Sequence, residues 1–176
     1  MGDTARMAAA AVHPMVDQLR FTRAEFRRAL RRVPAADAVR RLEPMNSIGW
    51  IVAHMAWHEQ RLWLFRAQGV TPQPELLEIA AYGGPATTPP LGRMLAAWKA
   101  VTAAADPWLD HLTAADLLDD LGGPKPAPKV GNGLQRITYH YWYHTGEILS
   151  IRQMLGHGRL PEYVGAIDDE APYRPA

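Results

Sequence analysis

The chain has 176 residues, no cysteine and a formal net charge of +1, and 48% of its residues are hydrophobic. This composition is typical of one globular domain with a single core. The lack of cysteine excludes disulfides, thiolate metal ligands and a cysteine nucleophile. The charge gives no general attraction to nucleic acid or membranes, and no segment has the roughly 20 apolar residues that span a bilayer. We therefore expect a small-molecule substrate, no nucleic-acid or membrane partner, and a cytoplasmic location.

Four long segments carry apolar residues at helical spacing and are predicted to be helices: about 12–32, 46–68, 91–111 and 132–156. Pro34 ends the first, and either Asn46 or Ser47 is a suitable N-cap for the second. The apolar stripe of the second segment is expected to include Phe65. Pro107 is expected to kink or split the last turn of the third segment. Residues 1–11 are expected to be the uneven start of a helix and not a signal peptide.

The connections between these segments differ in length. Residues 69–90 form a long, proline-rich crossover, and residues 113–131 include one helical turn followed by another proline-rich loop. Such a pattern predicts an all-α four-helix bundle with its long crossover between the second and third helices. We expect a single domain over residues 1–176, with a helical core at about 12–156 and an irregular C-terminal tail at 157–176. The tail is expected to pack on the mouth of the bundle or on a second subunit, so a homodimer is one expectation.

Two histidines mark the fourth predicted helix as a candidate metal site. His140 and His144 are four residues apart, which places them one turn apart and about 40° around the helix axis. Both fall on the apolar stripe that contains Ile137 and Ile148. Two inward imidazoles need partners, and a shared metal ion satisfies both, although histidines at this spacing are often only hydrogen-bonded to neighbours.

A third ligand is expected from the second helix, which offers His54 and His58. These two are also four residues apart. Periodicity slightly favours His58, which lies nearer the centre of the apolar stripe, and it leaves the choice open. The remaining histidines, His13, His111 and His157, are expected to face solvent.

Two segments resemble the DinB-like superfamily of metal-binding four-helix proteins. The segment SIGWIVAHMAWHE, residues 47–59, is similar to the second helix of that family, and RITYHYWYHTGEILSIRQMLG, residues 136–156, is similar to its last helix. The superfamily includes thiol-dependent S-transferases and the mycothiol-dependent maleylpyruvate isomerase type. The resemblance implies a four-helix fold and a metal bound by His54, His140 and His144, so it favours His54 over His58.

The resemblance also suggests what such a site does. Three histidines leave a coordination position open, as in catalytic metal sites, and the lack of cysteine means that any thiol is a separate small molecule such as mycothiol. Zinc is the expected ion, with nickel or iron as alternatives. The leading hypothesis is therefore a metal-dependent transferase or isomerase that uses a low-molecular-weight thiol. The alternatives are a metal-dependent hydrolase or natural-product tailoring enzyme, and a non-catalytic metal-binding stress-response protein.

Four further residues are candidates for supporting roles. Glu59 is a candidate general base near the metal or one partner of a surface salt bridge, and His58 either takes part in proton transfer or is a satisfied core histidine. Glu147 either accepts a ring N–H of His144 or pairs with an arginine. Arg152 corresponds to the family's arginine after the histidine motif and is a candidate for cofactor binding.

The arginines of the first predicted helix form the one strong run of charge: Arg20, Arg23, Arg27, Arg28, Arg31 and Arg32. A solvated helix face is the expected reading, and recognition of an anionic substrate or a dimer contact are the alternatives.

Overall fold

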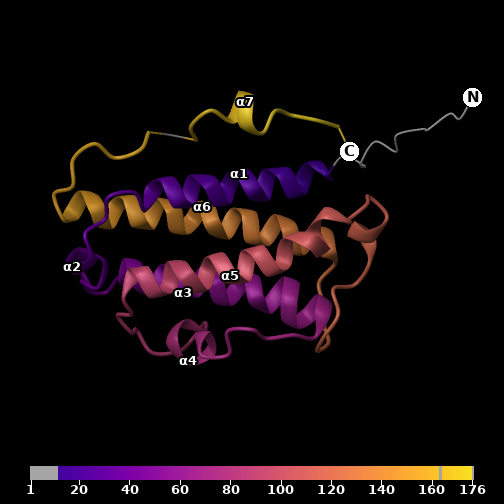
Figure 1. Cartoon of the computed structure of the whole chain (residues 1–176), viewed down its shortest axis with the longest axis horizontal. Helices are drawn as coiled ribbons and strands as arrows, with labels where there is room; N and C mark the ends of the chain where they lie inside the picture. Colours follow the sequence, from indigo (N-terminus) through magenta and orange to yellow (C-terminus); the bar gives the residue numbers. More distant parts are fainter. Residues whose placement is uncertain (1–11, 163, 176) are drawn as a thin grey trace, which may run out of the picture.

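The computed structural model describes residues 12–162 and 164–175, and these residues form a bundle of four long helices (Figure 1). The predicted start of a helix within residues 1–11 lies outside the described residues. The bundle helices are α1 (Pro14–Ala29), α3 (Ile48–Glu59) with its continuation η1 (Gln60–Arg66), α5 (Leu91–Asp110) and α6 (Val130–Met154). Four short elements lie in the connections and the tail: α2 (Ala35–Ala38), α4 (Leu76–Ala80), η2 (Asp116–Leu118) and α7 (Ile167–Glu170). No strand occurs among the described residues, which confirms the all-α prediction.

The long crossover sets the direction of the helices. Helices α1 and α6 run the same way along the bundle, and α3 and α5 run the opposite way (Figure 1). The chain can place α3 and α5 parallel to each other because residues 67–90 return along the full length of the bundle, with α4 packed on α3. The most extensive contacts are those of α3 with α5 and of α1 with α6.

The helix ends largely follow the signals in the sequence. Ser47 is the N-cap of α3, and its hydroxyl accepts a hydrogen bond from the backbone N–H of Trp50 at 3.1 Å. Helix α5 runs through Pro107 to Asp110 without a break, so the expectation that this proline splits the helix is wrong. The predicted turn before the proline-rich loop is the single 3₁₀ turn η2.

Phe65 is a correction to the predicted apolar stripe. Residues 60–66 form a π-helix, whose wider turn shifts the side chains that follow α3 around the helix axis. Trp63 and Leu64 are buried as a result, whereas Phe65 is 46% exposed. The regular period of an α-helix therefore places Leu62 correctly, since it is buried, but places Phe65 on the wrong face.

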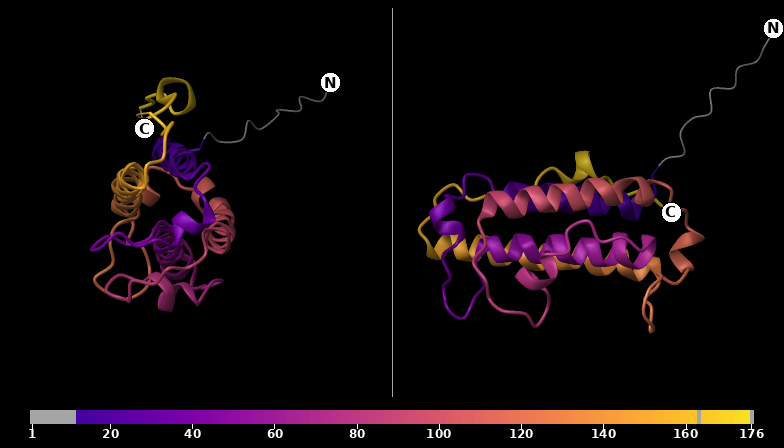
Figure 2. Two further views of the ribbon diagram at one scale, coloured as in Figure 1. Left: turned by 90° about the vertical axis from the view of Figure 1, so that its left-hand side faces the viewer. Right: turned by 60° about the horizontal axis from the view of Figure 1, so that its bottom comes forward.

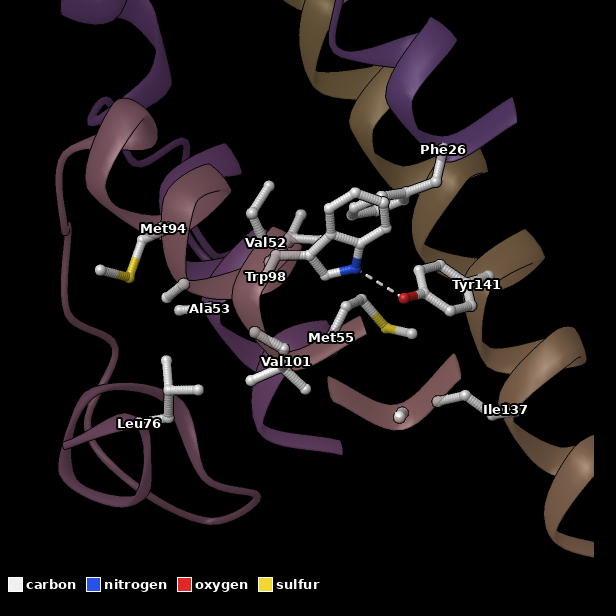
Figure 3. Packing of buried hydrophobic residues seen from close by; sticks show 14 of the residues in the cluster. Phe26, Val52, Ala53, Met55, Leu76, Met94, Trp98, Val101, Ile137 and Tyr141 are labelled. Carbon is white, nitrogen blue, oxygen red and sulfur yellow. Dashed lines mark hydrogen bonds between the residues drawn. The ribbon is translucent and has the colours of Figure 1, made fainter. Parts of the chain in front are cut away.

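Large side chains from all four long helices fill the core. Phe26 packs edge-on against Tyr141 with ring centroids 5.1 Å apart, and the indole N–H of Trp98 donates to the Tyr141 hydroxyl at 2.6 Å (Figure 3). The same hydroxyl donates to a carboxylate oxygen of Glu59 at 2.7 Å. Arg23 of α1 also donates to Glu59 at 2.7 Å, so helices α1, α3, α5 and α6 are joined through one buried polar network as well as by apolar contact.

The C-terminal tail returns along the outer side of α1, as two views of the chain agree (Figures 1 and 2). The side-chain amide of Gln18 donates to the carbonyl of Ala171 at 2.9 Å, and Arg174 forms an ion pair with Asp17. The described residues of the tail, 157–162 and 164–175, are irregular apart from the single turn α7. The tail thus packs mainly along the outside of α1 and not on the mouth of the bundle, which corrects the first of the two predicted packings. No helix among residues 12–162 and 164–175 is long and apolar enough to cross a membrane.

Candidate metal centre

Four histidines from two helices meet on one side of the bundle. His54 and His58 are carried by α3, and His140 and His144 by α6, which packs against it. His54, His58 and His144 are buried, and His140 is half-buried. Because each pair is four residues apart, both members of a pair face the neighbouring helix.

The ring nitrogens lie close enough to share one ion. Nε2 of His140 is 2.9 Å from Nε2 of His144, and Nδ1 of His140 is 2.6 Å from Nδ1 of His58. The His54 ring centroid is 5.0 Å from that of His140 and 5.3 Å from that of His144. One ring nitrogen from each of His54, His58 and His140 lies within 4.8 Å of the other two. The structure therefore supplies a cluster of at least three imidazole donors.

Acceptors around the cluster orient two of the rings. Nδ1–H of His54 donates to the carbonyl of Ala80 at 2.8 Å, and Nδ1–H of His144 donates to Glu147 at 2.7 Å. Carbonyl and carboxylate oxygens can only accept, so these Nδ1 atoms carry the protons and Nε2 is left with a lone pair in the neutral ring. Such outer contacts are characteristic of metal-binding histidines. Ala80 is the last residue of α4, so the long crossover takes part in building the site.

Aromatic rings enclose His54. Trp50 stacks on His54 with ring centroids 4.7 Å apart and an interplanar angle of 9°, and Trp57 lies on it with centroids 5.5 Å apart. On the other helix, Tyr143 contacts the His144 ring edge-on at 5.1 Å. Stacked rings restrict the imidazole orientations and exclude water from part of the cluster.

Burial keeps the imidazoles neutral. Desolvation lowers the pKa of His54 to about 4, and desolvation with the nearby His140 and His54 rings lowers the pKa of His58 to about 2. Desolvation, then the neighbouring His144 and His54 rings, lowers the pKa of His140 to about 3. A neutral imidazole is the form that binds metals, so these three rings are ready to act as ligands at neutral pH.

The donor set fits a divalent transition metal. Zinc–nitrogen bonds are about 2.0–2.1 Å long, so two nitrogens bound to one ion lie about 3.0 Å apart at a 90° angle and about 3.4 Å apart at a tetrahedral angle. The Nε2 atoms of His140 and His144, 2.9 Å apart, need to separate only slightly to meet this requirement. Imidazole nitrogens are suitable for zinc, nickel and iron alike.

Glu59 does not belong to the histidine cluster. Its carboxylate is 0% exposed and accepts two hydrogen bonds from Arg23, at 2.7 and 2.6 Å, and a third from the Tyr141 hydroxyl. Both of its oxygens are therefore occupied in the core, and this geometry gives no support to a general base. The alternative of a surface salt bridge is wrong as well, since Arg23 is only 5% exposed and the pair is buried.

Arg152 also lies away from the cluster. It is eight residues after His144 on α6, which is about 12 Å along the helix. Its side chain is 3% exposed, donates from Nη1 to the carbonyl of Ala29 at 2.5 Å and donates from Nε to Nδ1 of His157 at 3.3 Å. A cofactor bound to the metal reaches Arg152 only if it extends about 12 Å along α6.

Other residues also differ from their predicted surroundings. His13 is buried and caps α1 by accepting from the backbone N–H of Met15, and His157 is half-buried against Asp37 at 3.0 Å, so neither simply faces solvent. His111 is exposed, as expected. The arginines of α1 do not form one solvated face, because Arg23 is inside the bundle.

The sequence does not reveal the hydrogen-bond partners of two candidate residues, His54 and Glu59. The acceptor for His54 is a backbone carbonyl from the distant crossover, and no periodicity marks it. The partner of Glu59 on α1 is one arginine in a run of six, and nothing in the run distinguishes Arg23 from its neighbours.

The fold is an all-α bundle with a long crossover between α3 and α5, and histidines of α3 and α6 face each other inside it. These two features define a class of helical proteins with a candidate metal site. The comparison with known families names it: the profile of the DinB superfamily matches residues 18–148, about three quarters of the chain, and the chain belongs to this superfamily. No curated protein matches the chain.

Proposed function

We propose that this protein is a metal-dependent enzyme whose ion is held by His54, His140 and His144. The observation that carries the proposal is that each of these rings has an outer hydrogen-bond partner on Nδ1: the Ala80 carbonyl, His58 and Glu147, respectively. All three Nε2 atoms are thereby free to turn toward one ion. A histidine ligand almost always donates its second ring N–H in this way.

The alternative ligand set is His54, His58 and His140, the three whose ring nitrogens lie within 4.8 Å of one another. The one hydrogen-bonded ring nitrogen of His58 is Nδ1, which pairs with another ring of the cluster, His140, and its Nε2 has no hydrogen-bond partner within residues 12–162 and 164–175. His144, with its carboxylate partner, then lies outside the set. The outer contacts therefore favour His144 as ligand and His58 as the acceptor of the His140 Nδ1–H.

The proposed reaction is a transfer or isomerisation that uses a low-molecular-weight thiol such as mycothiol. When bound, a divalent ion at this site polarises a carbonyl or lowers the pKa of a coordinated thiol or water. The chain has no cysteine, so the thiol is a separate molecule. The proposal rests on the three-histidine donor set together with membership of a superfamily that includes thiol-dependent transferases.

The residues around the cluster have separate tasks in this proposal. Glu147 holds the proton on Nδ1 of His144 and thereby keeps its Nε2 available. Trp50 and Trp57 hold the ring of His54 in place. His58 is a poor proton carrier at neutral pH, because burial and its neighbours lower its pKa to about 2, and it acts by orienting His140. Zinc, a homodimer and a cytoplasmic location stay predictions.

A conjugation assay tests the proposal. Untagged protein loaded in parallel with zinc, nickel or iron(II) is incubated with mycothiol or bacillithiol and monochlorobimane, and the fluorescent conjugate is followed. We expect conjugation that requires both metal and thiol, is lost in His144→Ala, and is retained in His111→Ala, which changes an exposed histidine outside the cluster. Conjugation by His144→Ala at the rate of the unmodified protein contradicts the proposal.

The same preparation separates the other hypotheses. Turnover of ester or amide substrates without thiol favours a hydrolase or a tailoring enzyme. Tightly bound metal without an exchangeable coordination position, together with no turnover, favours a non-catalytic metal-binding protein.

A further inference from the structure

A second concave site lies at the end of the bundle where α1 and α6 both finish. The cavity has a volume of about 470 Å³, within the range of small-molecule sites. This end of the bundle faces the viewer in the left panel of Figure 2. Its position is set by the parallel arrangement of α1 and α6, which brings two helix C-termini together, with residues 157–161 of the tail forming a third wall.

The lining of this cavity is strongly basic. The residues that surround it are Arg28, Arg31, Arg32, Pro34, Arg152, His157, Gly158, Arg159 and Pro161. Five of these nine are arginines and none is a carboxylate, in a chain whose net charge is only +1. Such a concentration of one sign in a concave surface focuses the potential and attracts ions of the opposite sign.

Contacts within the protein account for only part of this positive charge. Arg28 pairs with Glu25, and His157 with Asp37. Arg152 donates to the carbonyl of Ala29, the last residue of α1, so the partial negative charge of that helix end offsets it in part.

Three other arginines of the lining are without internal partners. Arg31, Arg32 and Arg159 are exposed, and their side chains make no hydrogen bond or ion pair with the described part of the chain. Nothing in the fold thus explains why three arginines gather at this opening.

The backbone supplies an independent sign of a built site. Arg32 has φ of 59° and Arg159 has φ of 54°, and these are the two non-glycine residues with positive φ among those described. An L-residue in this left-handed region is strained, and glycine is the usual residue at such a position after a helix. The chain instead places an arginine at both positions, and both arginines line the same cavity. Retained strain of this kind is often found at ligand clamps.

We propose that this cavity binds a small molecule that carries two or more phosphate or carboxylate groups, at a site separate from the histidine cluster. Arg31, Arg32 and Arg159 supply the forked guanidinium donors that match such oxygens. Arg152, buried and fixed by two hydrogen bonds, forms the positive floor. The site is about 12 Å along α6 from His144, so it can serve the anionic part of a long substrate or an independent effector.

Calorimetric titration of the metal-free protein tests this proposal, because removal of metal prevents the probes from acting as chelators at the histidines. The probes are pyrophosphate and citrate at low ionic strength, with sodium chloride of equal ionic strength as the blank. We expect one molecule bound per chain, and a loss of about tenfold or more in affinity in each of Arg31→Gln and Arg32→Gly, since each removes a charge-assisted hydrogen bond. A preference for pyrophosphate indicates a phosphate-bearing ligand, and a preference for citrate indicates a polycarboxylate.

Two matched variants make the result specific. Arg27→Gln removes an exposed arginine of α1 that does not line the cavity, and His144→Ala removes the distant site; both are expected to bind the probes normally. Arg32→Gly is expected to keep or raise its unfolding temperature in chloride, because glycine adopts positive φ without strain. The proposal is overturned if neither probe binds at millimolar concentration, or if Arg27→Gln weakens binding as much as Arg31→Gln does.

Discussion

The two ligand sets at the histidine cluster make opposite predictions for His58 and His144. In the proposed set, His144 binds the ion through Nε2 and His58 only accepts a hydrogen bond from His140. We therefore expect His144→Ala to lose stoichiometric metal binding, whereas His58→Ala loses about 10- to 100-fold in affinity. That loss equals about 1.4 to 2.8 kcal/mol, the usual effect of removing an outer partner of a metal ligand.

The distances in the cluster give the physical basis for this expectation. Two nitrogens that share one ion at about 2.1 Å lie about 3.0 to 3.4 Å apart. The Nε2 pair of His140 and His144 is already at 2.9 Å, whereas the Nδ1 pair of His58 and His140, at 2.6 Å, has the length of a hydrogen bond and must open further. Glu147→Gln is expected to resemble His58→Ala, because it too changes only an outer partner.

The assay is a competition titration of untagged protein against a chromophoric chelator, with elemental analysis of each preparation. His111→Ala is the matched control, since it removes an exposed histidine outside the cluster and is expected to leave affinity unchanged. Circular dichroism of each metal-free variant checks that the bundle is folded. If His58→Ala abolishes metal binding while His144→Ala stays within about tenfold of the unmodified protein, the reasoning from outer hydrogen bonds is refuted.

Three further predictions concern stability, each measured by urea unfolding of the metal-free protein. Gly49→Ala is expected to destabilise by about 1 to 3 kcal/mol, because a Cβ there collides with a backbone carbonyl. Gly92→Ala, with open space at its Cβ, stabilises by about 0.5 kcal/mol, and equal effects of the two changes contradict the packing. Arg23→Met leaves Glu59 charged and unpaired in the core and costs about 3 to 5 kcal/mol. Adding Glu59→Gln, which keeps an acceptor for the Tyr141 hydroxyl, is expected to recover much of that loss, and no recovery means that the charge is not the cause. The third prediction concerns pH: the α3 histidines have pKa values lowered from 6.5 to about 4 and about 2, so the unfolded chain binds more protons below pH 6.5 and stability falls there. These two rings alone contribute a loss of about 2 kcal/mol between pH 6.5 and about 5.5, and a flat profile contradicts their neutral burial.

Local signals determined the helices and their order. Ser47 and the long proline-rich segment before Leu91 placed the second and third helices correctly, because caps and breakers act within a few residues. The spacing of His140 and His144 was sufficient to put both rings on one face of α6, since the period of a helix is set by its own backbone. The composition alone excluded thiolate ligands.

Other features depended on which segments pack together. The π-turn after Glu59 moved Phe65 outward, and a local period cannot reveal such a shift. The surroundings of Glu59 were decided by Arg23 and Tyr141, which are 36 and 82 residues away in the chain. Contacts of that kind require the helices to be docked, because partner choice depends on orientation and desolvation as well as on residue type.

For the metal centre, the sequence by itself determined that α3 and α6 each carry two histidines one turn apart, and it left His54 and His58 as alternatives. Only the tertiary structure decided that all four rings meet and that three of them have an outer hydrogen-bond partner on Nδ1. It also decided that Arg31 and Arg32, which follow α1, line one cavity together with Arg152 and Arg159. The physical reason is the same in both places: helix period sets which way a side chain points, and only the packing of distant helices decides what it meets.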